Sequence, residues 1–92
     1  YHPVNRAALL RMAQDEDYEV AREAVRAIAG SGDAWFTPGL VDLLGDRRIR
    51  DVVRRALFER GDDALAVLSR ALVDRRTPVA VVRHIPRTIA QF

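Results

Sequence analysis

The chain has 92 residues, of which 49% are apolar and 30% charged, and its formal net charge at pH 7 is +2. This length suits a single domain, and the composition is that of a folded protein rather than a disordered one. The lack of cysteine excludes disulfides and thiolate metal sites. No apolar run reaches the roughly 20 residues that span a bilayer. We therefore expect a cytoplasmic protein without membrane insertion. Because the sequence opens at Tyr1 rather than Met, we also expect it to be a segment of a longer protein.

Apolar residues recur every three or four positions along most of the chain, which is the spacing of one helix face. The pattern predicts six helices, near residues 4–14, 17–30, 37–45, 47–60, 62–73 and 77–90. No segment alternates as a strand would, so the expected fold class is all-α. The turns within each pair of helices are short and polar, and loops that short place neighbouring helices antiparallel. The helices should therefore form three hairpins.

Capping residues mark several of these boundaries. Asp17 is expected to cap the helix near 17–30. Thr37-Pro38 and Thr77-Pro78 each match an N-cap followed by proline at the first helical position. Pro86 lies inside the last expected helix, where proline removes a backbone donor. Because Ile89 continues the apolar face, we expect a kink there rather than the end of the helix.

The sequence repeats at a shift of 29 residues. Three segments superpose without gaps: VAREAVRAIAGSGD at 20–33, IRDVVRRALFERGD at 49–62 and the more divergent PVAVVRHIPRTIAQ at 78–91. Gly32-Asp33 and Gly61-Asp62 recur in register, each as a helix stop followed by a cap for the next helix. We therefore predict one domain, 1–92, built of three repeats at about 3–33, 34–61 and 62–92.

Two stretches, DEDYEVAREAVRAIAGSGD and GDAWFTPGLVDLLGDRRIRDVVRRALFERGD, resemble HEAT repeats of the short variety first noted in phycobilisome lyases. That family's pattern is an apolar first helix with paired leucines, an Asp-rich turn, a Val-Arg start to an Ala-rich second helix, and a Gly-Asp stop. The Val-Arg element stands here as Ile49-Arg50, but as Val20-Ala21 in the first repeat and Pro78-Val79 in the third, which also lacks the Gly-Asp. The resemblance implies an armadillo-like α-solenoid of antiparallel helical hairpins.

For function, the resemblance implies a binding surface. Members of the family are mostly scaffolds and adaptors, some are chromophore lyase subunits, and related solenoids include alkylpurine DNA glycosylases. They present a curved surface formed largely by the second helix of each hairpin. We therefore predict a non-enzymatic protein-interaction scaffold. Its partner would be another protein, adjacent repeats of the same parent chain, or a second copy; nucleic acid is the alternative partner.

No residue set has the spacing of a catalytic or metal site. His2 and His84 are far apart in the sequence, and a metal site on a helix needs a second His or Cys nearby. Ser31 and Ser69 lack the context of a nucleophile elbow. The glycines are spaced as turns rather than as a phosphate-binding loop. We predict no enzymatic activity, no metal and no cofactor.

The arginines are the one functional signal above background. Residues 1–45 carry four Arg against seven acids, a net charge of −3, whereas residues 46–92 carry eleven Arg against six acids, a net charge of +5. There is no Lys, which a GC-rich genome explains as well as a demand for groups that bind anions bidentately. Arg50 and Arg54 stand one helical turn apart, as do Arg83 and Arg87. Stacked repeats would align these four as a basic stripe on the concave face, suited to nucleic-acid phosphates or to an acidic partner helix.

The competing interpretation of these arginines is a solvated helix face. Asp51 precedes Arg54 and Arg55 by three and four residues, the spacing of routine surface ion pairs. Phe58 is expected in the core rather than stacked on bases. Both interpretations stay open at the level of sequence.

The last helix is too apolar all round to cap a solenoid. We predict that Val81, Val82 and Ile89 form an exposed apolar end, which serves self-association or the docking of a further repeat.

Overall fold

The computed structural model describes residues 5–92, and all of its regular structure is helical. Within that range no residue lies in a β-strand, so the predicted all-α class is confirmed. No helix in the described part of the chain is long and apolar enough to cross a membrane. In chain order the elements are α1 (Arg6–Met12), α2 (Tyr18–Ser31), the 3-10 helix η2 (Ala34–Phe36), α3 (Thr37–Asp42), the 3-10 helix η3 (Leu43–Gly45), α4 (Arg50–Glu59), α5 (Asp62–Val73), α6 (Val79–Val82) and α7 (Ile85–Ile89).

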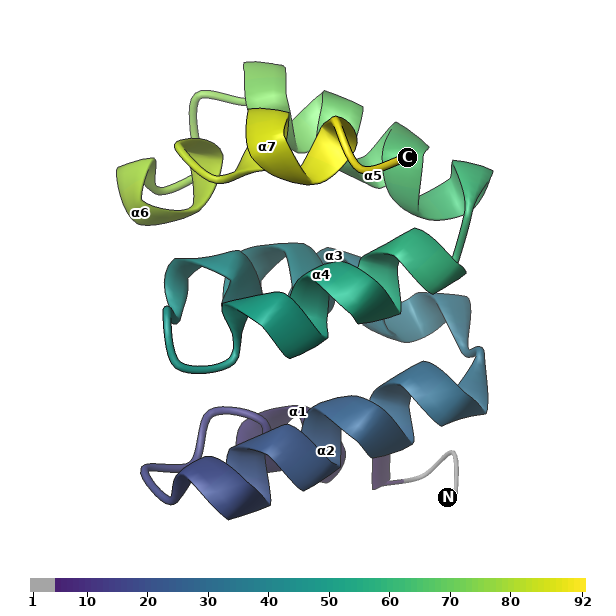
Figure 1. Ribbon diagram of the computed structural model, residues 1–92, viewed down its shortest axis with the longest axis vertical. Coiled ribbons are helices and arrows are strands. Elements are labelled where there is room, and N and C mark those ends of the chain that lie inside the picture. Colours follow the sequence, from purple (N-terminus) through teal and green to yellow (C-terminus); the bar gives the residue numbers. More distant parts are fainter. Residues whose placement is uncertain (1–4) are drawn as a thin grey trace.

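The helices lie in three successive levels along the long axis of the molecule (Figure 1). One level holds α1 and α2, the next α3 and α4, and the last α5 with α6 and α7. Packing between levels joins α2 to α4 and α3 to α5, and α7 packs on α5. In Figure 1, α2, α4 and α7 lie toward the viewer, with α1, α3 and α5 behind them. We call the surface formed by α2, α4 and α7 the front face.

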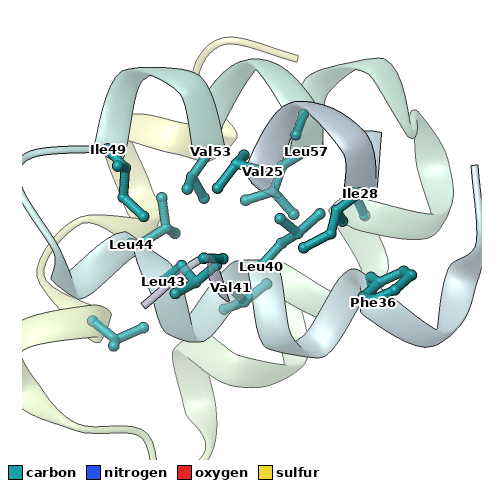
Figure 2. Packing of buried hydrophobic residues seen from close by; sticks show 14 of the residues in the cluster. Val25, Ile28, Phe36, Leu40, Val41, Leu43, Leu44, Ile49, Val53 and Leu57 are labelled. Carbon is teal, nitrogen blue, oxygen red and sulfur yellow. The ribbon is translucent and has the colours of Figure 1, made fainter. Parts of the chain in front are cut away.

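The hydrophobic core is centred where α2, α3 and α4 meet. Val25 and Ile28 of α2 point toward Leu40 of α3 and toward Val53 and Leu57 of α4 (Figure 2), and all five are fully buried. Complete burial of an aliphatic side chain of this size contributes about 1.5–3 kcal/mol. The same cluster continues into the last level through Leu68, Val81 and Ile85.

Local hydrogen bonds fix both ends of α2. Asp17 caps it as predicted, because its side chain accepts a hydrogen bond from the Glu19 backbone N–H (2.9 Å). Gly32 ends the helix with φ at 63°, the left-handed region that favours glycine. Asp33 then caps η2 by accepting from the Trp35 N–H (3.0 Å), and it pairs with Arg6 at 2.8 Å.

The two Thr-Pro steps do not cap as predicted. Thr37 is itself the first residue of α3, and its hydroxyl accepts a hydrogen bond from Arg60 Nη1 (3.4 Å). The Thr77 hydroxyl donates to the Ala71 carbonyl (2.7 Å) near the end of α5, and α6 has Pro78 at its N-cap without a side-chain cap. Each hydroxyl therefore forms a hydrogen bond outside its own helix: Thr37 with Arg60, which follows α4, and Thr77 with the end of α5.

The last predicted helix, 77–90, is broken rather than kinked. The first segment, α6, ends at Val82, and α7 begins at Ile85. Pro86 thus stands in the first turn of a new helix, where the missing N–H has no intrahelical partner to lose. The fourth helix also begins later than predicted, because residues 47–49 form a turn before Arg50.

The C-terminal level does not expose the side chains that we predicted for an apolar end. Val81 is only 4% exposed, and Val82 and Ile89 are partly buried against the core. The predicted exposure is therefore wrong: the break before Pro86 turns these residues inward onto η3 and α5. The large apolar side chains exposed at this end are Leu72, Val73, Val79 and Phe92.

Arg60, just after α4, ties three elements together. Its Nη2 donates to the Ile28 carbonyl (2.9 Å) in the last turn of α2, where helix carbonyls have no backbone partner within the helix. Its Nη1 donates to the Asp33 carbonyl (2.7 Å) and to the Thr37 hydroxyl (3.4 Å). Burial is the main cause that lowers the pKa of Arg60, and the charge of Asp33 opposes it.

Replacing Arg60 with Ala should therefore lower the free energy of unfolding by about 2–3 kcal/mol, because it removes three hydrogen bonds made by a partly buried charged group. Urea denaturation followed by circular dichroism measures this. Arg55→Ala is the matched control: its side chain is 82% exposed and pairs with Glu59 only at 4.0 Å, so its loss should cost less than about 0.5 kcal/mol. Equal losses in the two variants would contradict the role given to Arg60.

Candidate functional site

Three arginines lie near His84, and a fourth lies near Arg54, where α4 faces the turn between α6 and α7. Arg50 and Arg54 come from α4, Arg83 from the turn and Arg87 from α7. Their proximity shows in their mutual electrostatics: the charges of Arg50, Arg54 and Arg83 act on His84, and those of Arg50 and Arg87 act on Arg54. The structure thus brings together the four arginines singled out in the sequence, which we call the basic cluster.

The chain itself fixes two of these guanidiniums. Arg50 Nε donates to the Leu44 carbonyl at 2.8 Å, and Arg54 Nε donates to the Thr88 hydroxyl at 3.0 Å. Thr88 is fully buried and donates in turn to the His84 carbonyl (2.7 Å). The terminal nitrogens of both arginines have no hydrogen-bond partner among residues 5–92. Both guanidiniums are therefore held in place while their strongest donors remain available.

No member of the basic cluster forms an ion pair with a described residue. Asp51, which we considered as a partner for Arg54 or Arg55, pairs with neither, and Arg55 instead reaches Glu59 at 4.0 Å. The interpretation of routine surface pairing is therefore wrong for this cluster. The ion pairs in the described part of the chain use Arg6, Arg22, Arg26, Arg48, Arg55 and Arg76.

This unbalanced positive charge lowers two pKa values. Burial is the larger cause that lowers the pKa of Arg54, followed by the charges of Arg50 and Arg87; Asp51 opposes them weakly. The pKa of His84 falls below its ordinary value of 6.5, first through desolvation and then through Arg50, Arg54 and Arg83. The lowered pKa favours the neutral form of His84, and the four guanidiniums carry the charge of the site.

Two grooves flank α4 on the front face. The groove between α2 and α4 has a volume of about 760 Å³, and the groove between α4 and the C-terminal residues has about 580 Å³. Both are bordered by Asp51, Arg55 and Glu59. The first has a floor of small and branched apolar residues, and the second reaches Arg54 of the basic cluster. The remaining lining residues are Val25, Arg26, Ala29, Gly30, Val52 and Ala56 in the first groove, and Phe58 and Gln91 in the second.

An exposed aromatic pair borders the second groove. Phe58 is 49% exposed and Phe92 38%, and their rings lie 5.6 Å apart between centroids at 53°. The expectation that Phe58 belongs to the core is therefore wrong. In the 29-residue register Phe58 stands where the previous repeat has Ala29. Ala29 is itself only partly buried, so this position of the repeat lies at the edge of the core.

No group of three or more His, Cys, Asp or Glu that could hold a metal ion occurs within the described range, and His2 lies outside it. Comparisons of the chain with protein-family models, with curated proteins and with solved structures found no match. The function must therefore be inferred from the chemistry of the basic cluster and the grooves beside it.

Arg83→Gln should raise the pKa of His84, because a neutral side chain no longer disfavours the imidazolium. A pH titration of the His84 ring resonances by NMR measures the shift. Arg76→Gln removes an equal charge that does not act on His84 and should leave its pKa unchanged. An unmoved pKa in Arg83→Gln would show that the cluster does not surround His84.

Proposed function

We propose that this chain is a HEAT-like helical-repeat module, a non-enzymatic scaffold that binds an acidic segment of a partner protein across its front face. The observation that carries the proposal is the basic cluster, whose four guanidiniums have no ion pair among the described residues and one of which, Arg54, lines an open groove. Groups with such strong donors are expected to meet anions.

Recurring turns support the repeat-based part of this proposal. The turn within each level begins with an Asp whose side chain accepts a hydrogen bond from the backbone N–H two residues further on. These residues are Asp15 (2.7 Å), Asp46 (3.0 Å) and Asp74 (2.8 Å). Arg48 also donates from the second turn to the Glu16 carbonyl (2.7 Å) and the Asp15 carbonyl (3.0 Å) in the first. A unit that repeats its turn and docks on its predecessor is typical of solenoids.

The surroundings of the basic cluster favour a protein segment as its partner. Arginine and aromatic residues are enriched at the centres of protein interfaces, and here Arg54 and the exposed Phe58 border one groove. Apolar lining along the first groove, including the partly buried Ala29 and Val52, offers contact area for apolar side chains of the partner.

Acidic residues on the front face disfavour an extended nucleic acid. Asp51 and Glu59 border both grooves, so a phosphate backbone that followed α4 would meet carboxylates on its way. Nucleic acid therefore stays the second candidate, supported by the basic cluster together with an aromatic pair on which bases could stack.

The test is a fluorescence-anisotropy titration with a short labelled acidic amphipathic peptide, and with generic duplex and single-stranded DNA, at low and physiological salt. We expect the peptide to bind, and the double variant Arg83→Gln/Arg87→Gln to weaken it about tenfold through loss of two charge contacts. The control Arg75→Gln/Arg76→Gln removes the same charge outside the cluster and should leave the affinity within about twofold.

Tighter binding of DNA than of peptide, with a steep loss of affinity as salt rises, would replace this proposal with the nucleic-acid function. Equal losses in the two double variants would show that net charge, and not the basic cluster, attracts the peptide.

A further inference from the structure

We propose that the basic cluster recognises a phosphate monoester carried by a serine or threonine of the partner segment. This inference rests on the proposed function and names the group that anchors the partner. The geometry of the guanidiniums, their unbalanced charge and the place of His84 each point to a dianion rather than to a single carboxylate.

The first argument is the donor geometry of the cluster. Hydrogen bonds through Nε hold Arg50 on the Leu44 carbonyl (2.8 Å) and Arg54 on the Thr88 hydroxyl (3.0 Å). Their planar terminal donors are thus oriented before a ligand arrives. A phosphate monoester presents three strong acceptor oxygens, and the guanidinium fork matches two of them at a time. Several guanidiniums can therefore share one phosphate, whereas a carboxylate offers only two oxygens.

The second argument is the amount of charge to be balanced. Arg54 has two further cluster arginines near it, and Asp51 is the acid whose charge acts on it. Arg54 experiences repulsion from both Arg50 and Arg87. A carboxylate would offset one of these charges, while a phosphate monoester carries about −1.5 to −2 near neutral pH. The dianion thus relieves more of the mutual repulsion within the cluster.

The third argument is the position of His84, whose carbonyl accepts from the Thr88 hydroxyl (2.7 Å), the same hydroxyl that accepts from Arg54 Nε (3.0 Å). Arg50 and Arg54 from α4 and Arg83 from the preceding turn act on His84, and Arg87 and Asp51 lie near Arg54. A bound dianion would reverse the sign of this local field and favour the imidazolium. His84 therefore reports the arrival of an anion through an upward movement of its pKa.

The experiment compares three probes by NMR: N-acetyl-phosphoserine amide, N-acetyl-glutamate amide and inorganic phosphate. The Kd follows from the backbone amide shifts of α4 and α7, and the pKa of His84 is titrated with and without each probe. We expect the phosphoserine amide to bind at least about tenfold more tightly than the glutamate amide. It should also raise the pKa of His84, which the glutamate amide should move much less.

Two variants test the cause of this preference. Arg83→Gln/Arg87→Gln should reduce the affinity ratio of the two amides toward one, and Arg75→Gln/Arg76→Gln should preserve it. Arg87→Lys keeps the charge but removes the bidentate fork, so it should weaken phosphoserine more than glutamate.

Equal affinities for the two amides would overturn the inference and leave the binding of acidic segments standing. Tighter binding of inorganic phosphate than of the phosphoserine amide would assign the cluster to a free anion and also overturn it. If the phosphoserine amide binds while the acidic amphipathic peptide of the previous experiment does not, the proposed function fails and the phosphate site stands alone.

Discussion

Burial of apolar helix faces between successive levels is the constraint on which the rest of this structure depends. A pair of short helices cannot cover its own apolar side, so α2 needs α4 and α3 needs α5. The core residues Ile28, Leu40 and Leu57 come from three different helices and lose all solvent contact only when the levels are stacked. Polar contacts then fix the register: Arg60 donates to the end of α2, and Arg48 donates to the first turn. Both bonds reach backbone carbonyls, which makes them insensitive to the side chains of the previous level.

Arginine has two roles in this molecule, and the difference lies in where its donors go. The terminal nitrogens of Arg48 and Arg60 donate hydrogen bonds to backbone carbonyls of the chain. Arg50 and Arg54 use only Nε in this way and keep their terminal nitrogens for other partners. The second arrangement costs stability, because like charges repel and no described carboxylate pairs with them. Residues that violate a local rule of stability are expected at functional sites.

Local signals explain which parts of the fold were predictable from the sequence. The helix 17–30 agrees with α2 within a residue, because apolar period, the Asp17 cap and the Gly32 stop coincide there. The helix 62–73 has the bounds of α5 through its apolar period alone, since Asp62 is its first residue rather than a side-chain cap. The predicted N-cap at Thr37 is wrong because its hydroxyl accepts a hydrogen bond from Arg60, 23 residues away. Pro86 was placed inside a helix that breaks at residues 83–84. The same break buries Val81, and the exposed Phe58 could only be placed once α7 and the C-terminal residues had been positioned.

The basic cluster was foreseeable as pairs of arginines, but its neighbours were not. The four-residue spacing in the sequence predicts that Arg50 lies beside Arg54, and Arg83 beside Arg87. The hydrogen bond from Arg54 to Thr88, 34 residues away, then brings the two pairs together. Along α4, Arg50, Arg54 and Phe58 follow one another at steps of four residues, so they lie on one stripe of about 12 Å. A partner segment on the front face would therefore meet charge at the start of α4 and an aromatic ring toward its end. That order would give a bound segment a direction, with its anionic group near His84 and its apolar group near Phe58 and Phe92.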